Sequence, residues 1–139
     1  MTFHYWIKGE GLTSWKYWPR TNKVTAIWVQ IGNEAFVNVA WLYSSMAHEY
    51  QHVNQALADP KTTEENEPMA EFSAYTWEAF HATETGVIND QLGMQDIGRR
   101  TKQQGWDKMT ALEQEENQET YDGAIIIIQD AIGDPSWIP

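Results

Sequence analysis

Two of the four histidines in this chain of 139 residues are four positions apart, and a glutamate follows the first of them. The stretch reads His48-Glu49-Tyr50-Gln51-His52. On a helix, residues i and i+4 are neighbours on one face, so both imidazoles would reach one metal ion. Glu49 would lie about 100° around the helix from His48. That position suits a carboxylate that hydrogen-bonds a water on the metal without binding the metal itself.

A third ligand is needed, because a catalytic zinc normally has three protein ligands and one open position. The chain has no cysteine, so the ligands must be histidine and carboxylate. Glu71 is our candidate, because it lies one turn inside the next predicted helix and is followed by the small Ala74. The other residues that could serve as the third ligand are Glu64, Glu67 and His81.

A β-hairpin is predicted ahead of the motif. Residues 13–18 and 23–31 are rich in aromatic and β-branched residues, and the turn-forming sequence PRTN separates them. In the second strand, alternate residues predict one face toward the core and an opposite face that carries Trp28. The predicted core face consists of Thr25, Ile27, Val29 and Ile31.

The motif itself lies in a predicted helix from residue 34 to residue 59, with Asn33 as its N-cap. An apolar stripe at helical spacing predicts the core face of this helix, directed away from the histidines. The stripe consists of Val39, Tyr43, Met46, Tyr50, Val53 and Leu57. Asp59 and Pro60 end the helix, and residues 61–67 are expected to form a solvated loop.

The second helix is predicted to begin at Pro68 and to end before Gly86. Residues 87–139 are predicted to be mostly helical. Breaks are possible at Gly93, Gly98, Gly105 and Gly123, and residues 124–132 read as either a strand or a buried helix. The expected fold is therefore α+β, with an N-terminal hairpin or small sheet packed on a mostly helical body, in one domain spanning residues 1–139.

Charge and composition limit the partners. The chain carries 20 acidic and 9 basic side chains, a net charge of −11, which disfavours nucleic acid and anionic membranes. We find neither a signal peptide nor a transmembrane segment in the sequence. We therefore expect a soluble protein without membrane insertion, either cytoplasmic or secreted as part of a longer chain.

The pattern of His48, Glu49, His52, Glu71 and Ala74 resembles the zincin metallopeptidases of the thermolysin-like, glutamate-ligand type. Residues 40–82 are also similar to the compact metallopeptidase domains at the ends of bacterial polymorphic and type VI secretion toxins. The resemblance implies Zn²⁺ held by the two histidines and Glu71. This sequence departs from the family pattern at Tyr75, where the family has an aspartate that orients a histidine. Glu78 is our candidate for that task, and His81 is a further residue expected near the ligands.

The resemblance implies hydrolysis of peptide bonds in a peptide or protein substrate, by a zinc-activated water with Glu49 as general base. A separate inhibitor or immunity protein would then protect the producing cell. The strand at residues 23–31 is our candidate for aligning the substrate, and His81, Tyr75 and Tyr121 are unranked candidates for stabilising the oxyanion. Two alternatives stay open: an acidic binding or inhibitor protein with a fortuitous motif, and a zinc protein without peptidase activity.

Overall fold

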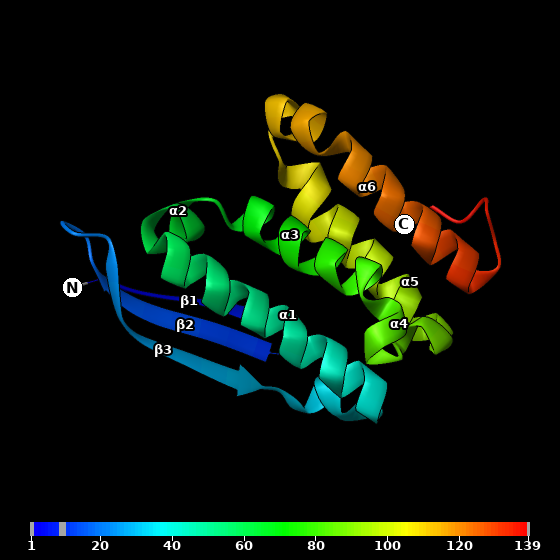
Figure 1. Ribbon diagram of the computed structural model, residues 1–139, viewed down its shortest axis with the longest axis horizontal. Helices are drawn as coiled ribbons and strands as arrows, with labels where there is room; N and C mark the ends of the chain where they lie inside the picture. Colours follow the sequence, from blue (N-terminus) through cyan, green and yellow to red (C-terminus); the bar gives the residue numbers. More distant parts are fainter. Residues whose placement is uncertain (1, 9–10, 139) are drawn as a thin grey trace.

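The fold is α+β, as predicted, with a small sheet at one end and helices over the rest of the chain (Figure 1). This computed structural model describes residues 2–8, as backbone, and residues 11–138. Three antiparallel strands form the sheet in the order β1-β2-β3. They span Thr2–Lys8 (β1), Gly11–Trp18 (β2) and Lys23–Ile31 (β3). The hairpin of β2 and β3 agrees with the prediction, whereas β1 adds a strand that we did not predict.

A bulge in β3 makes the predicted core face wrong in part, since Ile27 packs on the core as predicted. Pairing passes from Lys16–Ala26 to Tyr17–Val24, so Thr25 is an extra residue in β3. The extra residue reverses the alternation, and Val24 and Ile27 therefore both pack on the core. Of the residues predicted to face the core, Thr25 and Val29 are exposed instead.

Helix α1 (Val39–Ala58) carries the motif and begins later than predicted. A short 3₁₀ helix, η1 (Asn33–Val37), precedes it, and Asn38 is the N-cap, because the Asn38 side chain accepts a hydrogen bond from the Trp41 amide. The prediction of Asn33 as the cap was wrong. Asp59 ends α1, as predicted.

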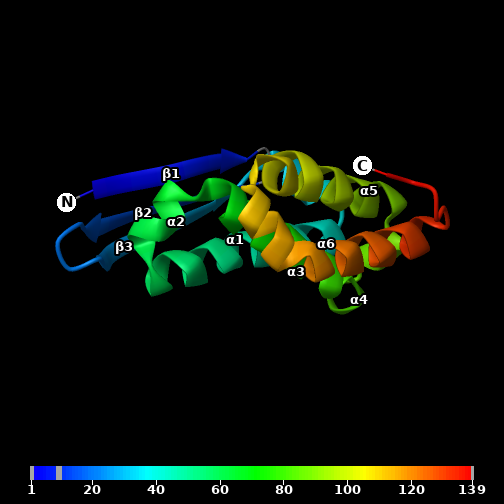
Figure 2. The same cartoon turned by 90° about the horizontal axis from the view of Figure 1, so that it is seen from above.

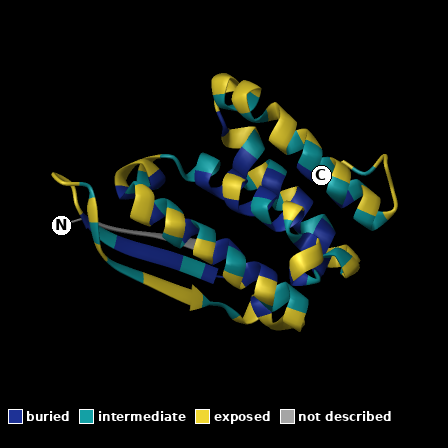
Figure 3. Cartoon of the chain, in the orientation of Figure 1, coloured by how far each residue is buried: buried dark blue, intermediate teal, exposed yellow. Residues whose placement is uncertain are grey.

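The apolar stripe of α1 does not face the core, which is the largest error in the prediction. Val39, Tyr43, Met46, Tyr50 and Leu57 are exposed, and the histidine face is buried against the sheet and against helix α3 (Glu67–Phe80). Burial of this polar face is tolerated because its side chains hydrogen-bond to one another and to their neighbours. Figure 3 shows the exposed side of α1 in yellow.

A hydrogen-bonded junction holds the hairpin against α1. The Asn22 side-chain amide donates to Asp59 Oδ1 at 2.7 Å, and the Lys61 backbone amide donates to Asn22 Oδ1 at 3.1 Å. Asp59 also caps helix α2 (Pro60–Glu65), which forms where we predicted a loop. Pro60 lacks an amide hydrogen and therefore suits the first turn of α2.

The remaining helical segments follow α3 in the chain, and the later ones pack on the side of α3 that is away from the sheet (Figure 1 and Figure 2). They are α4 (Ala82–Thr85), η2 (Val87–Asn89), α5 (Gln91–Arg100), the π-helical segment η3 (Thr101–Gly105), η4 (Trp106–Lys108) and α6 (Ala111–Ile132). The stretch 124–132 is therefore helical. Gly93, Gly98 and Gly123 lie inside helices and break none of them. At Gly98 a Cβ would lie 2.5 Å from the Trp137 ring, so close packing explains this glycine.

Two apolar clusters stabilise the molecule, and α3 connects them. One lies between the sheet, α1 and α3 and consists of Trp15, Tyr17, Ala56 and Ala70. The other joins the helices and consists of Ala79, Ala82, Val87, Met94, Ile97, Ala124 and Ile128. Within the described residues, none of the helices is long and apolar enough to span a bilayer.

Candidate metal centre

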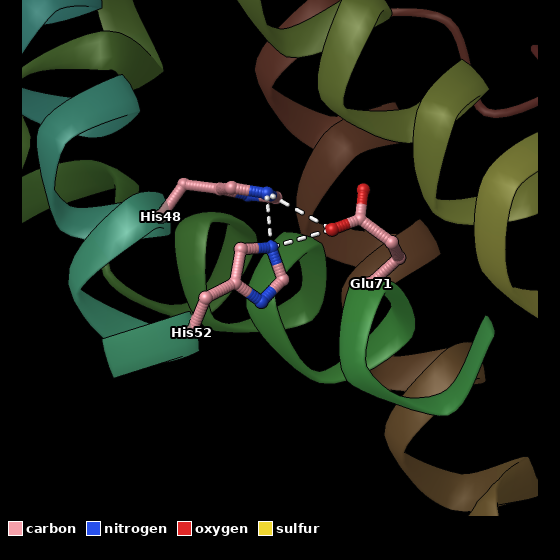
Figure 4. A group of neighbouring side chains, drawn as sticks. All are labelled: His48, His52 and Glu71. Atoms are coloured by element: carbon pink, nitrogen blue, oxygen red, sulfur yellow. Dashed lines mark hydrogen bonds and ion pairs between the residues drawn. The ribbon is translucent and has the colours of Figure 1, made fainter. Parts of the chain in front are cut away.

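Three predicted ligands meet between α1 and α3 (Figure 4). His48 and His52 project from consecutive turns of α1, and Glu71 comes from the first half of α3. The two imidazole Nε2 atoms are 3.1 Å apart. Glu71 Oε1 lies 3.5 Å from the Nε2 of His48 and 2.5 Å from that of His52. All three side chains are buried, so the sequence pattern and the fold bring the same residues together.

Glu78 orients His48. The Nδ1 atom of His48 lies 3.0 Å from Glu78 Oε2, and the Ser44 hydroxyl donates to Glu78 Oε1 at 2.5 Å. A carboxylate accepts a hydrogen bond from Nδ1, which leaves Nε2 as the nitrogen that can bind a metal ion. Glu78 thus occupies the position expected of a residue that orients a ligand histidine.

Gln55 plays the same part for His52. The Gln55 amide nitrogen donates to the Ala70 carbonyl at 3.1 Å, which leaves Gln55 Oε1 as the acceptor 2.9 Å from His52 Nδ1. His52 Nδ1 therefore donates, which leaves Nε2 as the nitrogen that can bind a metal ion. We did not predict Gln55, although its spacing of three residues from His52 on the same helix is a usable signal.

The donor set fits a zinc ion. Two imidazole nitrogens and a carboxylate oxygen are typical zinc ligands, and these three atoms lie within 4.8 Å of one another. Tetrahedral geometry with zinc–nitrogen bonds of about 2.0–2.1 Å places ligand atoms roughly 3.3 Å apart. The separations of 3.1 and 3.5 Å are close to that value, whereas the 2.5 Å between His52 Nε2 and Glu71 Oε1 is shorter and must open for an ion to enter. Residues on either side fix both tautomers so that the electron pairs converge, as in carboxylate–histidine–zinc arrangements.

Without a metal, a proton on His48 offsets the negative charge of the Glu71 and Glu78 carboxylates beside it. Burial by itself lowers the pKa of His48, but hydrogen bonds to Glu71 and Glu78 outweigh burial and raise this pKa well above its usual value. Burial by itself raises the pKa of Glu71, but hydrogen bonds from His48 and His52 outweigh it and hold this pKa well below its usual range. The site therefore favours a cation, whether a proton on His48 or a metal ion.

Glu49 faces the sheet rather than Glu71. The Thr13 hydroxyl on β2 donates to Glu49 Oε2 and lies 3.3 Å from the Glu49 backbone carbonyl. Gly11 leaves room for this carboxylate, because a Cβ there would lie 2.7 Å from Glu49 Oε1. Neither Thr13 nor Gly11 was predicted, since no local pattern links β2 to a residue 36 positions away.

The candidates for stabilising an oxyanion differ in their surroundings. The Tyr75 ring packs on His48 at 4.2 Å between ring centroids, and its hydroxyl donates to Gln104 at 3.1 Å. Burial, together with the Glu71 carboxylate, raises the pKa of Tyr75 well above its usual value. Tyr121 stacks on Trp106 at 4.2 Å, and burial raises its pKa to about 12. Tyr75 is thus the candidate in contact with a predicted ligand.

The alternative third ligands lie elsewhere. His81 ends α3, stacks on Trp77 at 4.0 Å and donates from Nδ1 to the Trp77 carbonyl at 2.8 Å. The Glu64 carboxylate accepts a hydrogen bond from the Tyr17 hydroxyl. Glu67 is the first residue of α3, one turn before Glu71. The group that could hold a metal among the described residues contains Glu71 and none of these three.

Comparisons of the chain with protein-family models, with curated proteins and with solved structures gave no match. The chemistry of the site therefore carries the functional argument.

Proposed function

We propose that this protein is a zinc metallopeptidase in which His48, His52 and Glu71 hold the ion. The observation that carries the proposal is the convergence of two imidazole Nε2 atoms on the Glu71 carboxylate, with each Nδ1 held by its own acceptor. Arrangements of this kind are built for metal ions rather than for a single hydrogen bond.

When bound, a zinc ion supplies Lewis acidity, which polarises a carbonyl oxygen and lowers the pKa of water. Glu49 acts as the general base and takes the proton of the attacking water. The Thr13 hydroxyl binds Glu49 Oε2, so Oε1 is the oxygen left to receive the proton, and the carboxylate must turn from the sheet toward the ligands to do so. Glu49 then delivers that proton to the leaving amine.

The sheet supports the choice of a peptide substrate. Strand β3 lies at an edge of the three-stranded sheet and contacts α1. An extended peptide that pairs with a sheet edge is aligned by main-chain hydrogen bonds. We therefore keep β3 as the strand that positions the substrate.

A zinc protein without peptidase activity is the second candidate. The support for this second candidate is the burial of the site. Four side chains are each at most 4% exposed: His48, Glu49, His52 and Glu71. A structural zinc is closed to solvent, whereas a catalytic zinc keeps an open position. The two candidates therefore agree on the ion and differ on hydrolysis.

Elemental analysis tests whether the protein binds zinc through these ligands. Protein purified without added metal is expected to contain one zinc per chain, and the metal is lost in His48→Ala and in Glu71→Ala. Glu84→Ala, a change at an exposed glutamate, is the matched control for Glu71→Ala and keeps its zinc, as does His81→Ala. Folded wild-type protein that neither contains zinc nor takes it up would overturn the proposal.

Hydrolysis is tested separately. The zinc-loaded protein is expected to cleave an unfolded protein substrate, and Glu49→Ala is expected to keep its zinc while losing at least about 100-fold in rate. Zinc binding without cleavage of a broad peptide library would favour the second candidate. Equal cleavage by wild type and Glu49→Ala would exclude Glu49 as the base.

A further inference from the structure

The exposed face of α1 carries no acidic or basic residue and is mostly apolar, although the polar Asn54 is also exposed. The acidic and basic residues of this helix are His48, Glu49 and His52, and all three are buried on its other face. Large apolar side chains occupy the exposed face at the following exposed fractions: Val39 82%, Tyr43 55%, Met46 52%, Tyr50 60% and Leu57 59%. Single exposed apolar residues are ordinary, whereas a continuous stripe of them marks an interface.

The stripe forms one side of a groove. Val39, Tyr43, Met46 and Tyr50 line a groove of about 550 Å³, and Trp77 of α3 belongs to its wall. Figure 3 shows the exposed residues of α1 on the side nearest the viewer, and Figure 2 shows that α1 lies at that side of the molecule. A partner can therefore approach along the full length of the helix.

The spacing of the stripe indicates a helix as the partner. Its six residues follow intervals of four, three, four, three and four, with the half-buried Val53 completing the series. Intervals of three and four average 3.5 residues, the repeat of the apolar seam in a coiled coil. A helix that packs along this seam inserts its side chains between those of α1.

The series of intervals between the stripe residues is the same in both directions along α1. In an antiparallel pair of α1 helices, Met46 therefore lies opposite Tyr50 of the second copy, and Tyr43 lies opposite Val53 of the second copy. A face that is complementary to itself in this way is what a two-fold symmetric dimer requires.

The distribution of charge favours contact between two copies through the exposed face of α1. Two molecules that each carry a net charge of −11 repel one another, and contact between acidic faces would strengthen the repulsion. The exposed face of α1, about 30 Å long, brings no like charges together.

From these observations we propose that α1 is a homodimer interface, in which two copies of the chain pack antiparallel along Val39, Tyr43, Met46, Tyr50, Val53 and Leu57. The inference is independent of the metal site, because the stripe and the histidines are on different faces of α1. Since repulsion between the two acidic molecules opposes association, salt is expected to strengthen the dimer.

Sedimentation equilibrium of the full chain tests the dimer. Wild type is expected to have about twice the chain mass of 16.1 kDa. Met46→Glu/Tyr50→Glu places like charges opposite each other and is expected to weaken association by at least about 100-fold. Leu92→Glu is the matched control, because Leu92 is 71% exposed on α5, and this variant stays dimeric. Circular dichroism checks that each variant is folded.

A second double variant tests the antiparallel register. In Met46→Lys/Tyr50→Glu, each lysine lies opposite a glutamate of the second copy, so association is expected to recover at least about tenfold over the Glu/Glu variant. Wild type that has the mass of a single chain at every concentration would overturn the proposal. A dimer that survives Met46→Glu/Tyr50→Glu, or one that Met46→Lys/Tyr50→Glu fails to restore, would overturn it as well.

Discussion

At the scale of single residues, the candidate site depends on the acceptors behind the histidines. Glu78 and Gln55 set which nitrogen of His48 and of His52 has the free electron pair. The Ser44 hydroxyl and the Ala70 carbonyl in turn hold these two side chains. A chain of hydrogen bonds therefore fixes the geometry before any metal binds.

Glu78→Gln tests this dependence. A neutral amide accepts a weaker hydrogen bond from His48 Nδ1 than a carboxylate does, so we expect the zinc dissociation constant to rise about tenfold. Competition with a zinc-binding dye measures the change. Glu84→Gln changes an exposed carboxylate and should leave the dissociation constant unaltered. Equal affinity in wild type and Glu78→Gln would show that the contact between Glu78 and His48 does not tune the site.

Gly11→Ala tests the placement of Glu49. A Cβ at residue 11 would lie 2.7 Å from Glu49 Oε1, so the carboxylate must move. We expect unchanged zinc content and a fall in peptidase rate of at least about tenfold, because Glu49 is the base and not a ligand in the proposed mechanism. Gly123→Ala is the control, since a Cβ there meets only the Phe80 ring, at 3.2 Å. Loss of zinc in Gly11→Ala would mean that Glu49 and the ligands are not independent.

At the scale of elements, the start of α1 determines where the motif lies in the fold. Asn38 accepts from the Trp41 amide at 2.8 Å, and its own amide nitrogen donates to Asp90 at 2.8 Å. We expect Asn38→Ala to lower the free energy of unfolding by about 1 kcal/mol, measured by urea denaturation. Asn33→Ala, at the cap that we predicted from the sequence, should change it by a few tenths of a kcal/mol at most. If Asn33→Ala lowered the free energy of unfolding more than Asn38→Ala did, Asn33 rather than Asn38 would be the cap.

Local patterns were enough to predict the elements that carry the site. Helical spacing placed His48 and His52 on one face, and the helix after Pro68 brought Glu71 to them. Partners distant in sequence were out of reach, because Thr13 contacts Glu49 only through the tertiary fold. The burial of α1 was predicted on the wrong face because hydrophobicity alone assigned the core. Hydrogen bonds among the buried polar groups outweigh that preference here.

At the scale of the whole molecule, the site lies along α3 between the two apolar clusters. Ala70 belongs to the cluster beneath the sheet and Ala79 to the cluster among the helices, while Glu71, Tyr75 and Glu78 lie between them on the same helix. Helix α3 therefore carries residues of the site and of both clusters, so a change of ionisation at the site affects the helix on which both clusters pack. The stability of the molecule should depend on pH through these groups.

In the metal-free protein, His48 and Glu71 should make the stability depend on pH in opposite directions. The folded-state pKa of His48 is raised, so the stability that it contributes to the metal-free protein is complete below about 6.5 and is lost as pH rises through the raised value. The folded-state pKa of Glu71 is lowered, so its contribution is complete above about 4.5 and is lost as pH falls through the lowered value.

A zinc ion held by the proposed ligands would compete with the proton for His48, so the stabilisation by zinc should grow with pH. From about pH 6 to about pH 8, we expect the Tm in chelator to fall and the gap in Tm between zinc and chelator to widen. Thermal unfolding followed by circular dichroism measures both. Glu71→Gln removes the carboxylate that the two histidines share and should abolish the gap at every pH. A gap that narrows as pH rises would mean that zinc, if it binds at all, does not displace a proton from this site.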